Sequence, residues 1–224
     1  LALTITSNNN GTDFSTANPS VTLTGRAPIA IQTLLVNGVA YPVTWTAITH
    51  WTLNIALSAA TNQLVLSGID FRGRPIPGLT DSVTIRYSGP PIDPTGFVVI
   101  NEIMFDPPTN GAGFVEVLNT SSAGAFDLSG WSLSGVGYTF PPGIVLAPGA
   151  LAVVAADLAA FRATYGTAIV PVGEFPGSLQ NNGERLRLVR PGVPPAADLV
   201  VDELRYEAQP PWPDAVGNGA SLQL

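Results

Sequence analysis

Short runs of apolar and β-branched residues alternate with clusters of Asn, Gly, Pro and Asp along the first part of the chain. Short strands at regular spacing, with turn residues between them, are typical of an antiparallel β-sandwich. The pattern therefore predicts an all-β module at residues 1–88. Its expected strands lie at 1–6, 21–24, 34–36, 44–46, 49–57, 63–67 and 82–87.

The run 49–57 shows the two-residue period most clearly. Trp51, Leu53 and Ile55 alternate with His50 and Asn54. Because successive side chains of a strand point to opposite faces, the first set is expected in the core and the second in solvent. His50 is the only histidine, and the nearby sequence holds no acid that could orient it for catalysis.

The second part of the chain repeats the strand pattern and adds one helix. Asp157 is a suitable N-cap, Phe161 and Tyr165 fall on one side of the predicted helix, and Gly166 is a suitable stop. This part is therefore predicted to be a second sandwich, at 97–224, with a single short helix. Its expected strands lie at 97–105, 114–119, 131–134, 151–155, 185–189 and 200–206.

A proline- and glycine-rich segment separates the two parts. Residues 88–96 read Ser-Gly-Pro-Pro-Ile-Asp-Pro-Thr-Gly, and such a composition favours a linker over an element. We place the linker at 89–96. The predicted fold class is all-β, with two consecutive immunoglobulin-like β-sandwich domains.

Composition removes most kinds of catalysis. The chain of 224 residues has no cysteine, its nine basic residues are all arginine, and its hydrophobic fraction of 46% is enough for a core. Disulfides, thiolate nucleophiles, iron-sulfur clusters, phosphate-binding lysine loops and Schiff bases are thereby excluded. With one histidine as well, we expect a protein that is not an enzyme.

The charge of −7 is concentrated in the second part. Residues 1–90 carry a net charge of +1 and residues 91–224 a net charge of −8. Nucleic-acid binding needs clustered basic residues, so no nucleic-acid partner is expected. The longest apolar stretch, 144–156, contains Pro148 and Gly149 and is shorter than the ~20 residues of a spanning helix, so no membrane insertion is expected.

Several blocks of the second part carry a family resemblance. The residues concerned are 99–107 (Val-Ile-Asn-Glu-Ile-Met-Phe-Asp-Pro), 114–119, 127–133 (Asp-Leu-Ser-Gly-Trp-Ser-Leu), 146–149, 161–166, 182–188, 212–213 and 219–224.

Through these blocks, residues 97–224 resemble the lamin-tail family, an immunoglobulin-like sandwich found in nuclear lamins and in many exported bacterial proteins. Residues 1–88 are similar, more weakly, to bacterial immunoglobulin-like modules of the glucodextranase accessory-domain type, through 21–25, 36–38, 60–64 and 69–73.

The resemblance implies a non-catalytic accessory, interaction or spacer module of an exported bacterial protein. Together with a start at Leu1 that shows neither an initiator methionine nor a signal peptide, it leads us to expect a piece of a longer polypeptide. The expected location is secreted, cell-surface or periplasmic. Expected partners are other domains of the parent polypeptide, cell-envelope proteins or glycans, while the oligomeric state stays open.

A calcium-dependent interaction domain is one alternative. Glu102 and Asp106 precede a turn, and Glu116 lies on the following predicted strand. If these strands form a hairpin, the carboxylates converge, and calcium takes six to eight hard oxygen ligands. The spacing matches no EF-hand loop, and no other cofactor is expected. A glycosidase would need two such carboxylates and a deep cleft, for which two small sandwiches offer little chain.

A carbohydrate-binding module is the other alternative, because exposed aromatic rings form platforms for sugars. The candidate residues are Trp131, Tyr138 and Trp212, and Trp45 and Trp51 are further tryptophans to consider. In the competing interpretation these rings belong to the cores. Trp131 then follows a turn at Gly130, and Trp212, between two prolines, covers one end of the second sandwich.

Overall fold

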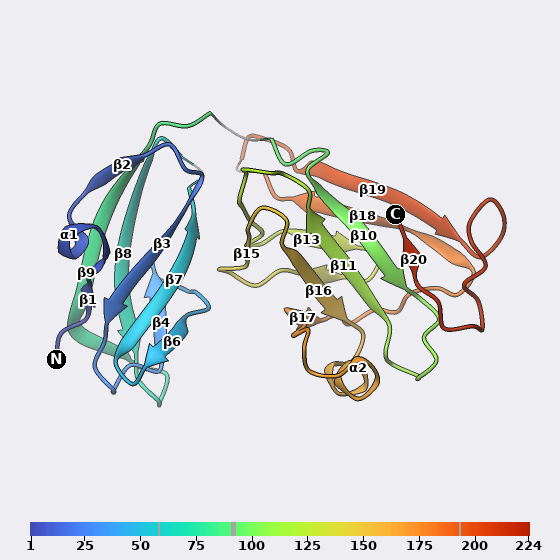
Figure 1. Ribbon diagram of the computed structural model, residues 1–224, viewed down its shortest axis with the longest axis horizontal. Coiled ribbons are helices and arrows are strands. Elements are labelled where there is room, and N and C mark those ends of the chain that lie inside the picture. Colours follow the sequence, from blue (N-terminus) through green and yellow to red (C-terminus); the bar gives the residue numbers. More distant parts are fainter. Residues whose placement is uncertain (58, 91–92, 193) are drawn as a thin grey trace. The chain divides into compact units, whose positions relative to one another are not determined.

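A computed structural model describes residues 1–57, 59–90, 93–192 and 194–224 (Figure 1). The chain divides into two compact units. The N-terminal unit comprises Leu1–Ile92, Ala123–Asp127 and Pro142–Ala147, and the C-terminal unit comprises the rest from Asp93 to Leu224. The prediction of all-β, immunoglobulin-like sandwiches is confirmed, with 45% of the residues in strands and 6% in helices. Residues 91 and 92 of the predicted linker lie outside the described residues.

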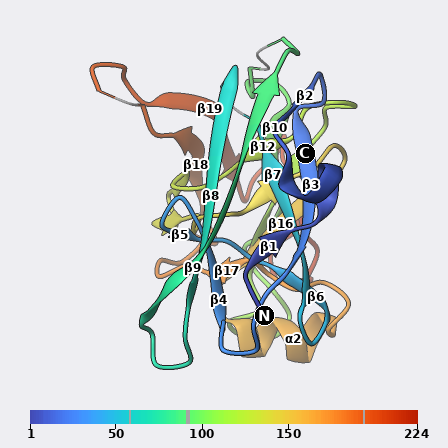
Figure 2. The same cartoon turned by 90° about the vertical axis from the view of Figure 1, so that its left-hand side faces the viewer.

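The N-terminal unit contains two sheets with long antiparallel ladders. β8 (Thr61–Ile69) and β9 (Pro75–Tyr87) run side by side, as Figure 2 shows, and β2 (Phe14–Thr16) joins the same sheet in parallel with β9. In spatial order the first sheet is β1 (Thr4–Ile5), β3 (Ser20–Arg26), β7 (His50–Ala56) and β6 (Thr44–Ala47). The second is β2 (Phe14–Thr16), β9 (Pro75–Tyr87), β8 (Thr61–Ile69), β4 (Thr33–Val36) and β5 (Val39–Ala40). A two-stranded pair, β12 (Phe126–Asp127) and β15 (Val145–Leu146), is also part of this unit.

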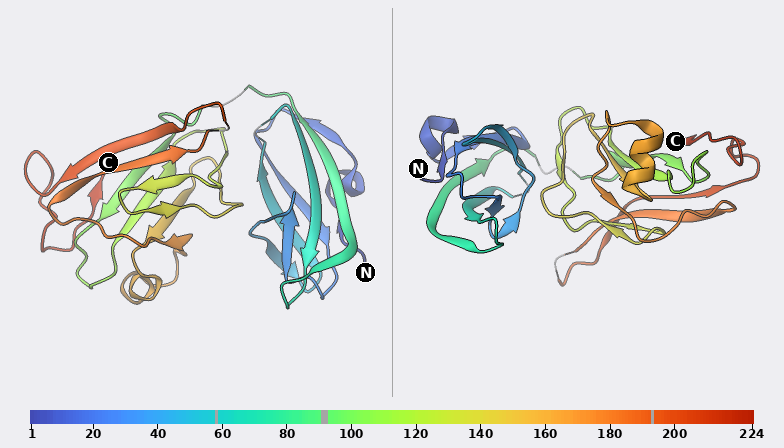
Figure 3. Two further views of the ribbon diagram at one scale, coloured as in Figure 1. Left: turned by 180° about the vertical axis from the view of Figure 1, so that it is seen from behind. Right: turned by 90° about the horizontal axis from the view of Figure 1, so that it is seen from below.

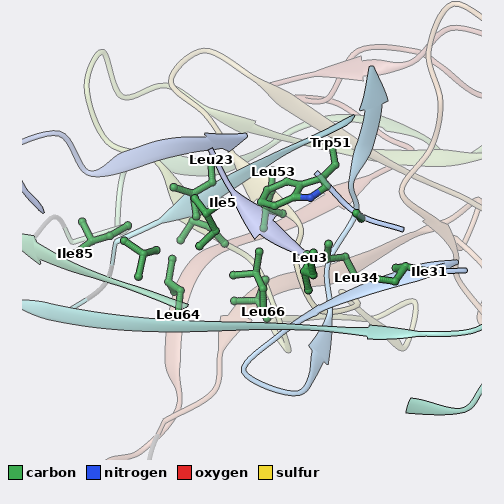
Figure 4. Packing of buried hydrophobic residues seen from close by; sticks show 14 of the residues in the cluster. Leu3, Ile5, Leu23, Ile31, Leu34, Trp51, Leu53, Leu64, Leu66 and Ile85 are labelled. Atoms are coloured by element: carbon green, nitrogen blue, oxygen red, sulfur yellow. The ribbon is translucent and has the colours of Figure 1, made fainter. Parts of the chain in front are cut away.

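The core of the N-terminal unit follows the predicted alternation. Trp51, Leu53 and Ile55 are at most 4% exposed and pack with Leu23 and Leu66 (Figure 4). Their neighbours on β7 point the other way, so that His50 and Asn54 are exposed, as predicted. The alternation therefore decides which face of β7 is buried.

Gly25 lets the largest core side chain approach the backbone of its partner strand. It pairs with Trp51 across β3 and β7, and a Cβ at Gly25 would meet both the Trp51 ring and the backbone oxygen of Thr4. A strand glycine of this kind marks a close approach of a ring or a backbone.

The first strand is shorter than predicted. The expected strand at 1–6 is reduced to β1, and α1 (Ser7–Gly11) follows it as a single short turn. Asn8, Asn9 and Asn10 all have positive φ, between 52° and 59°. Asparagine tolerates this left-handed region better than other residues with a Cβ, so the Asn-rich sequence turns where a strand was expected to end.

The C-terminal unit has two further sheets, and Figure 3 shows the long β18–β19 hairpin of one of them. All six predicted strands are present, and the unpredicted ones are two residues long. The five-stranded sheet is β17 (Gly173–Glu174), β16 (Leu151–Ala155), β11 (Phe114–Asn119), β10 (Val98–Met104) and β20 (Leu222–Gln223). The four-stranded sheet is β14 (Tyr138–Thr139), β13 (Ser132–Ser134), β18 (Gly183–Arg190) and β19 (Leu199–Glu207).

The predicted helix is confirmed as α2 (Leu158–Tyr165), between β16 and β17. The Asp157 carboxylate accepts a hydrogen bond of 2.7 Å from the Ala160 N–H, and Glu174 accepts one of 3.0 Å from the Leu158 N–H. Gly166 ends the helix at a positive φ of 82°. Two acidic groups thus satisfy N–H groups of the first turn, where the helix dipole favours negative charge.

Among the described residues, no helix has the length and apolar character to cross a membrane.

Candidate functional site

The outer face of the five-stranded sheet carries an unusual mixture of side chains. Along β11, Val115 and Val117 are fully buried in the sandwich core. Phe114 and Glu116 alternate with them and therefore lie on the opposite face of the sheet. That face is turned away from the sandwich interior, and on it an acidic side chain lies next to an aromatic one.

A β-bulge places a second carboxylate on this face. Ile100 pairs with Val117, and Glu102 pairs with Glu116. Between these two pairs β10 advances by two residues while β11 advances by one, so β10 contains one extra residue. In a regular strand Glu102 would share the buried face of Ile100, two residues before it. The extra residue reverses this parity and sets Glu102 directly opposite Glu116.

Uncharged groups of the chain hold both carboxylates. The bulged residue, Asn101, donates from Nδ2 to Glu116 Oε1 at 2.7 Å, and the Ser221 hydroxyl donates to Glu102 Oε1. Glu116 is only 7% exposed. Within the described parts of the chain, neither glutamate forms a salt bridge.

The helix α2 supplies two rings that stand next to the carboxylates. Phe161 packs edge-on against Phe114, with ring centroids 5.7 Å apart, and Tyr165 does the same at 5.5 Å. The Phe161 and Tyr165 rings are 4.9 Å apart. The three rings form a compact aromatic cluster on the outer face of the sheet.

These groups line a concave pocket of about 680 Å³, which we call the sheet-face pocket. The volume lies in the range typical of small-molecule sites. Met104, Phe114 and Val153 provide apolar side chains from three adjacent strands. The other lining residues are Glu102, Glu116, Phe161, Tyr165, Ile169, Pro213, Gly219, Ala220, Ser221 and Gln223.

Tyr165 is electrostatically coupled to this pocket. Burial, followed by the negative charge of Glu102, raises the pKa of the Tyr165 phenol above its usual value. Tyr165 therefore stays uncharged at neutral pH, and the acidic side chains of the pocket lining are Glu102 and Glu116.

The calcium candidates do not gather into one site. Glu102 and Glu116 are cross-strand partners in the predicted hairpin, but the Asp106 carboxylate forms its hydrogen bonds with other residues. Its carboxylate accepts hydrogen bonds from Asn181 Nδ2 at 2.9 Å and from the Gly217 N–H at 2.6 Å, and so ties three loops together. The described residues contain no group of three or more His, Asp or Glu side chains able to hold a metal ion.

The aromatic candidates belong largely to the interior. Trp131 is 3% exposed and Tyr138 is 6% exposed, and the Tyr138 hydroxyl donates to the Val172 carbonyl at 3.3 Å. Burial raises the pKa of this phenol. Trp212 is partly exposed. Because Trp131 and Tyr138 are covered, these three rings form no open platform for a sugar.

The remaining tryptophans do not change this picture. Trp51 is buried in the N-terminal unit, and Trp45, in the same unit, is 38% exposed.

His50 is exposed and lies 3.4 Å from the Thr49 hydroxyl through Nδ1. Its predicted position on the exposed face of the strand is confirmed.

Sequence reasoning missed most of the pocket. It named the two glutamates, but not Asn101, Met104, Phe114 or Ser221 as their neighbours. One signal was present, because the predicted helix already had Phe161 and Tyr165 on one side. Nothing in the sequence indicated which surface that side would meet.

Comparison with models of protein families places part of the chain in a known family. The family model of the Lamin Tail Domain matches residues 92–207, about half of the chain, which include β10, β11, β16 and α2. No curated protein matches the chain.

Proposed function

The chain belongs to the lamin tail domain family through residues 92–207, and on this premise we propose that it is a non-catalytic interaction module that holds a partner in the sheet-face pocket. The family is a non-enzymatic, immunoglobulin-like one. The observation that carries the proposal is a pocket with an apolar base and two carboxylates held in place by Asn101 and Ser221.

The chemistry of the pocket supports binding rather than turnover. Ser221 is the one aliphatic hydroxyl in the described pocket lining, and it donates to Glu102. No imidazole or amine lines the described pocket to activate this hydroxyl. Nucleophilic catalysis by serine needs such an activating base. Carboxylates that accept hydrogen bonds only from uncharged groups keep further acceptor capacity for a ligand.

A ligand screen on the full chain tests this proposal. Met104 is the only methionine and lines the pocket, so a ¹³C-methyl label at methionine gives one resonance that reports on the site. We expect at least one class among short peptides, amines, carboxylates and oligosaccharides to shift this resonance saturably. A panel without any saturable shift would contradict a role in binding.

Assays with aryl glycosides and phosphoesters test the non-catalytic part. We expect no turnover above the buffer rate. Turnover that disappears in Glu116→Gln would show that the pocket is an active site and would overturn this part of the proposal.

We also propose that the parent protein is exported by a bacterium, and that its other domains, envelope proteins or glycans are the partners. Support comes from the family, which is common in exported bacterial proteins, and from a cysteine-free composition, which suits domains large enough to fold without disulfides. An antibody against this chain should detect the parent in the envelope or medium of the producing cells. Detection in the cytosol alone would contradict export.

A further inference from the structure

Two negative charges stand opposite each other in the sheet-face pocket. Glu102 and Glu116 are direct cross-strand partners, and like charges in that position destabilise a sheet. Glu116 is also 93% buried, which adds a desolvation cost for its charged form. A cation bound between the two carboxylates would offset both costs.

The described lining of the pocket supplies no such cation. The pocket lining includes no arginine, and lysine is absent from the sequence. Each glutamate accepts one hydrogen bond through Oε1, while Oε2 of each accepts none from any described residue. Two carboxylate oxygens therefore remain as acceptors for a donor that comes from outside.

The apolar part of the pocket restricts what the cation can be. Beside the carboxylates lie Met104 and the aromatic cluster of Phe114, Phe161 and Tyr165. A hydrated metal ion would gain nothing from these surfaces, and calcium would need several more oxygen ligands. An ammonium or guanidinium group on an alkyl stem would contact both the carboxylates and the apolar side chains. The charged group would form ion pairs with the carboxylates, and the group and its stem would form cation–π and apolar contacts with the rings.

We propose that the sheet-face pocket binds the cationic side chain of a lysine or arginine residue in a partner polypeptide. This inference rests on the proposed function and adds the ligand class to it. The stem lies against Met104 and the aromatic cluster. The charged head donates to Oε2 of Glu102 and of Glu116, and it relieves their mutual repulsion.

Matched blocked amino acids test the charge requirement. The Met104 methyl resonance is followed while the full chain is titrated with the N-acetyl, N′-methylamide derivatives of lysine and arginine. Norleucine and citrulline, blocked in the same way, serve as uncharged counterparts. We expect saturable shifts for the cations and at least about tenfold weaker binding for the uncharged compounds. Equal binding of both kinds would overturn the inference while leaving the pocket as a binding site.

Single substitutions test the two carboxylates. Glu102→Gln and Glu116→Gln should each weaken binding of the lysine derivative at least about tenfold. Glu207→Gln changes the net charge equally at an exposed glutamate of β19, which pairs with Arg205, and should leave binding unchanged. Because neutralising one carboxylate removes the repulsion, the melting midpoint of each pocket variant should stay the same or rise. Unchanged affinity in both pocket variants would refute the assignment.

A final comparison identifies the source of the cation. We expect a Leu-Lys-Leu peptide with blocked ends to bind more tightly than n-butylamine, because the peptide also contacts the apolar rim. Equal affinity for n-butylamine would assign the pocket to free amines and would overturn the part of the proposal that names a polypeptide.

Discussion

At the scale of single residues, Tyr206 shows how a polar group is accommodated in the C-terminal core. Its side chain is fully buried and stacks on Phe105, with ring centroids 5.2 Å apart. The hydroxyl lies 3.0 Å from both the Gln180 carbonyl oxygen and Glu184 Oε1. Burial, with the charge of Glu184 as the second cause, raises the pKa of this phenol well above its usual value. The hydroxyl thus secures the turn before β18 to the core.

Removal of this hydroxyl should destabilise the C-terminal unit. Tyr206→Phe leaves two acceptors without their donor, and we expect a loss of about 2 kcal/mol in the free energy of unfolding. Urea denaturation followed by the Met104 methyl resonance measures it. The control is Tyr165→Phe, whose hydroxyl has no hydrogen-bond partner among the described residues, and which should cost less than about 0.5 kcal/mol. Equal losses in the two variants would contradict this account.

At the scale of elements, the β10 bulge and the helix α2 build the pocket. The bulge at Asn101 turns Glu102 to the outer face, and the Leu224 N–H donates to the Asn101 carbonyl at 2.9 Å. The helix brings Phe161 onto the same face, where it is 2% exposed. The bulge thus supplies the charge of the pocket and the helix supplies its rings.

The N-cap of α2 is expected to contribute measurably to stability. Asp157→Ala removes the acceptor for the Ala160 N–H, and we expect a loss of about 1 kcal/mol. Asp157→Ser keeps a capping oxygen and should lose only a few tenths of a kcal/mol. Denaturation of both variants, followed at Met104, gives the comparison. If serine and alanine cost the same at this position, the cap is not what stabilises the helix.

At the scale of the whole molecule, the charge inventory is unusually simple. The chain has no lysine and no cysteine, so tyrosine is its one side-chain type with an ordinary pKa between about 9 and 12. The raised pKa values of Tyr138, Tyr165 and Tyr206 all belong to phenols of the C-terminal unit. These three phenols are therefore expected to make the stability of that unit sensitive to alkaline pH.

The pH dependence follows from the direction of these shifts. Below about pH 10 the tyrosines are protonated in both the folded and the unfolded chain, and stability is constant with respect to them. Above about pH 10 the unfolded chain loses these protons while the folded unit retains them, so unfolding becomes more favourable. We expect the free energy of unfolding to fall by as much as about 1.4 kcal/mol per pH unit for each such tyrosine.

Urea denaturation between pH 8 and 11.5, followed by the Met104 methyl resonance, measures this fall in the free energy of unfolding. The fall should be smaller in Tyr206→Phe. A constant stability up to pH 11.5 would contradict it.

Local patterns in the sequence determined much of this protein. The period of two along 49–57 predicted which side chains of β7 are buried, because alternation is a property of any single strand. Asp157 and Gly166 marked the ends of α2, because capping acts within one turn. Absent residue types, such as lysine and cysteine, excluded whole classes of chemistry before any fold was known.

The tertiary structure alone decided the pocket. By alternation from Ile100, Glu102 belongs to the core face, and only the slip in the ladder with β11 turns it outward. Ser221 reaches Glu102 from a position 119 residues away in the sequence. Pairing register and long-range closure depend on the free energy of the whole assembled sheet, so they are not encoded in any local window of residues.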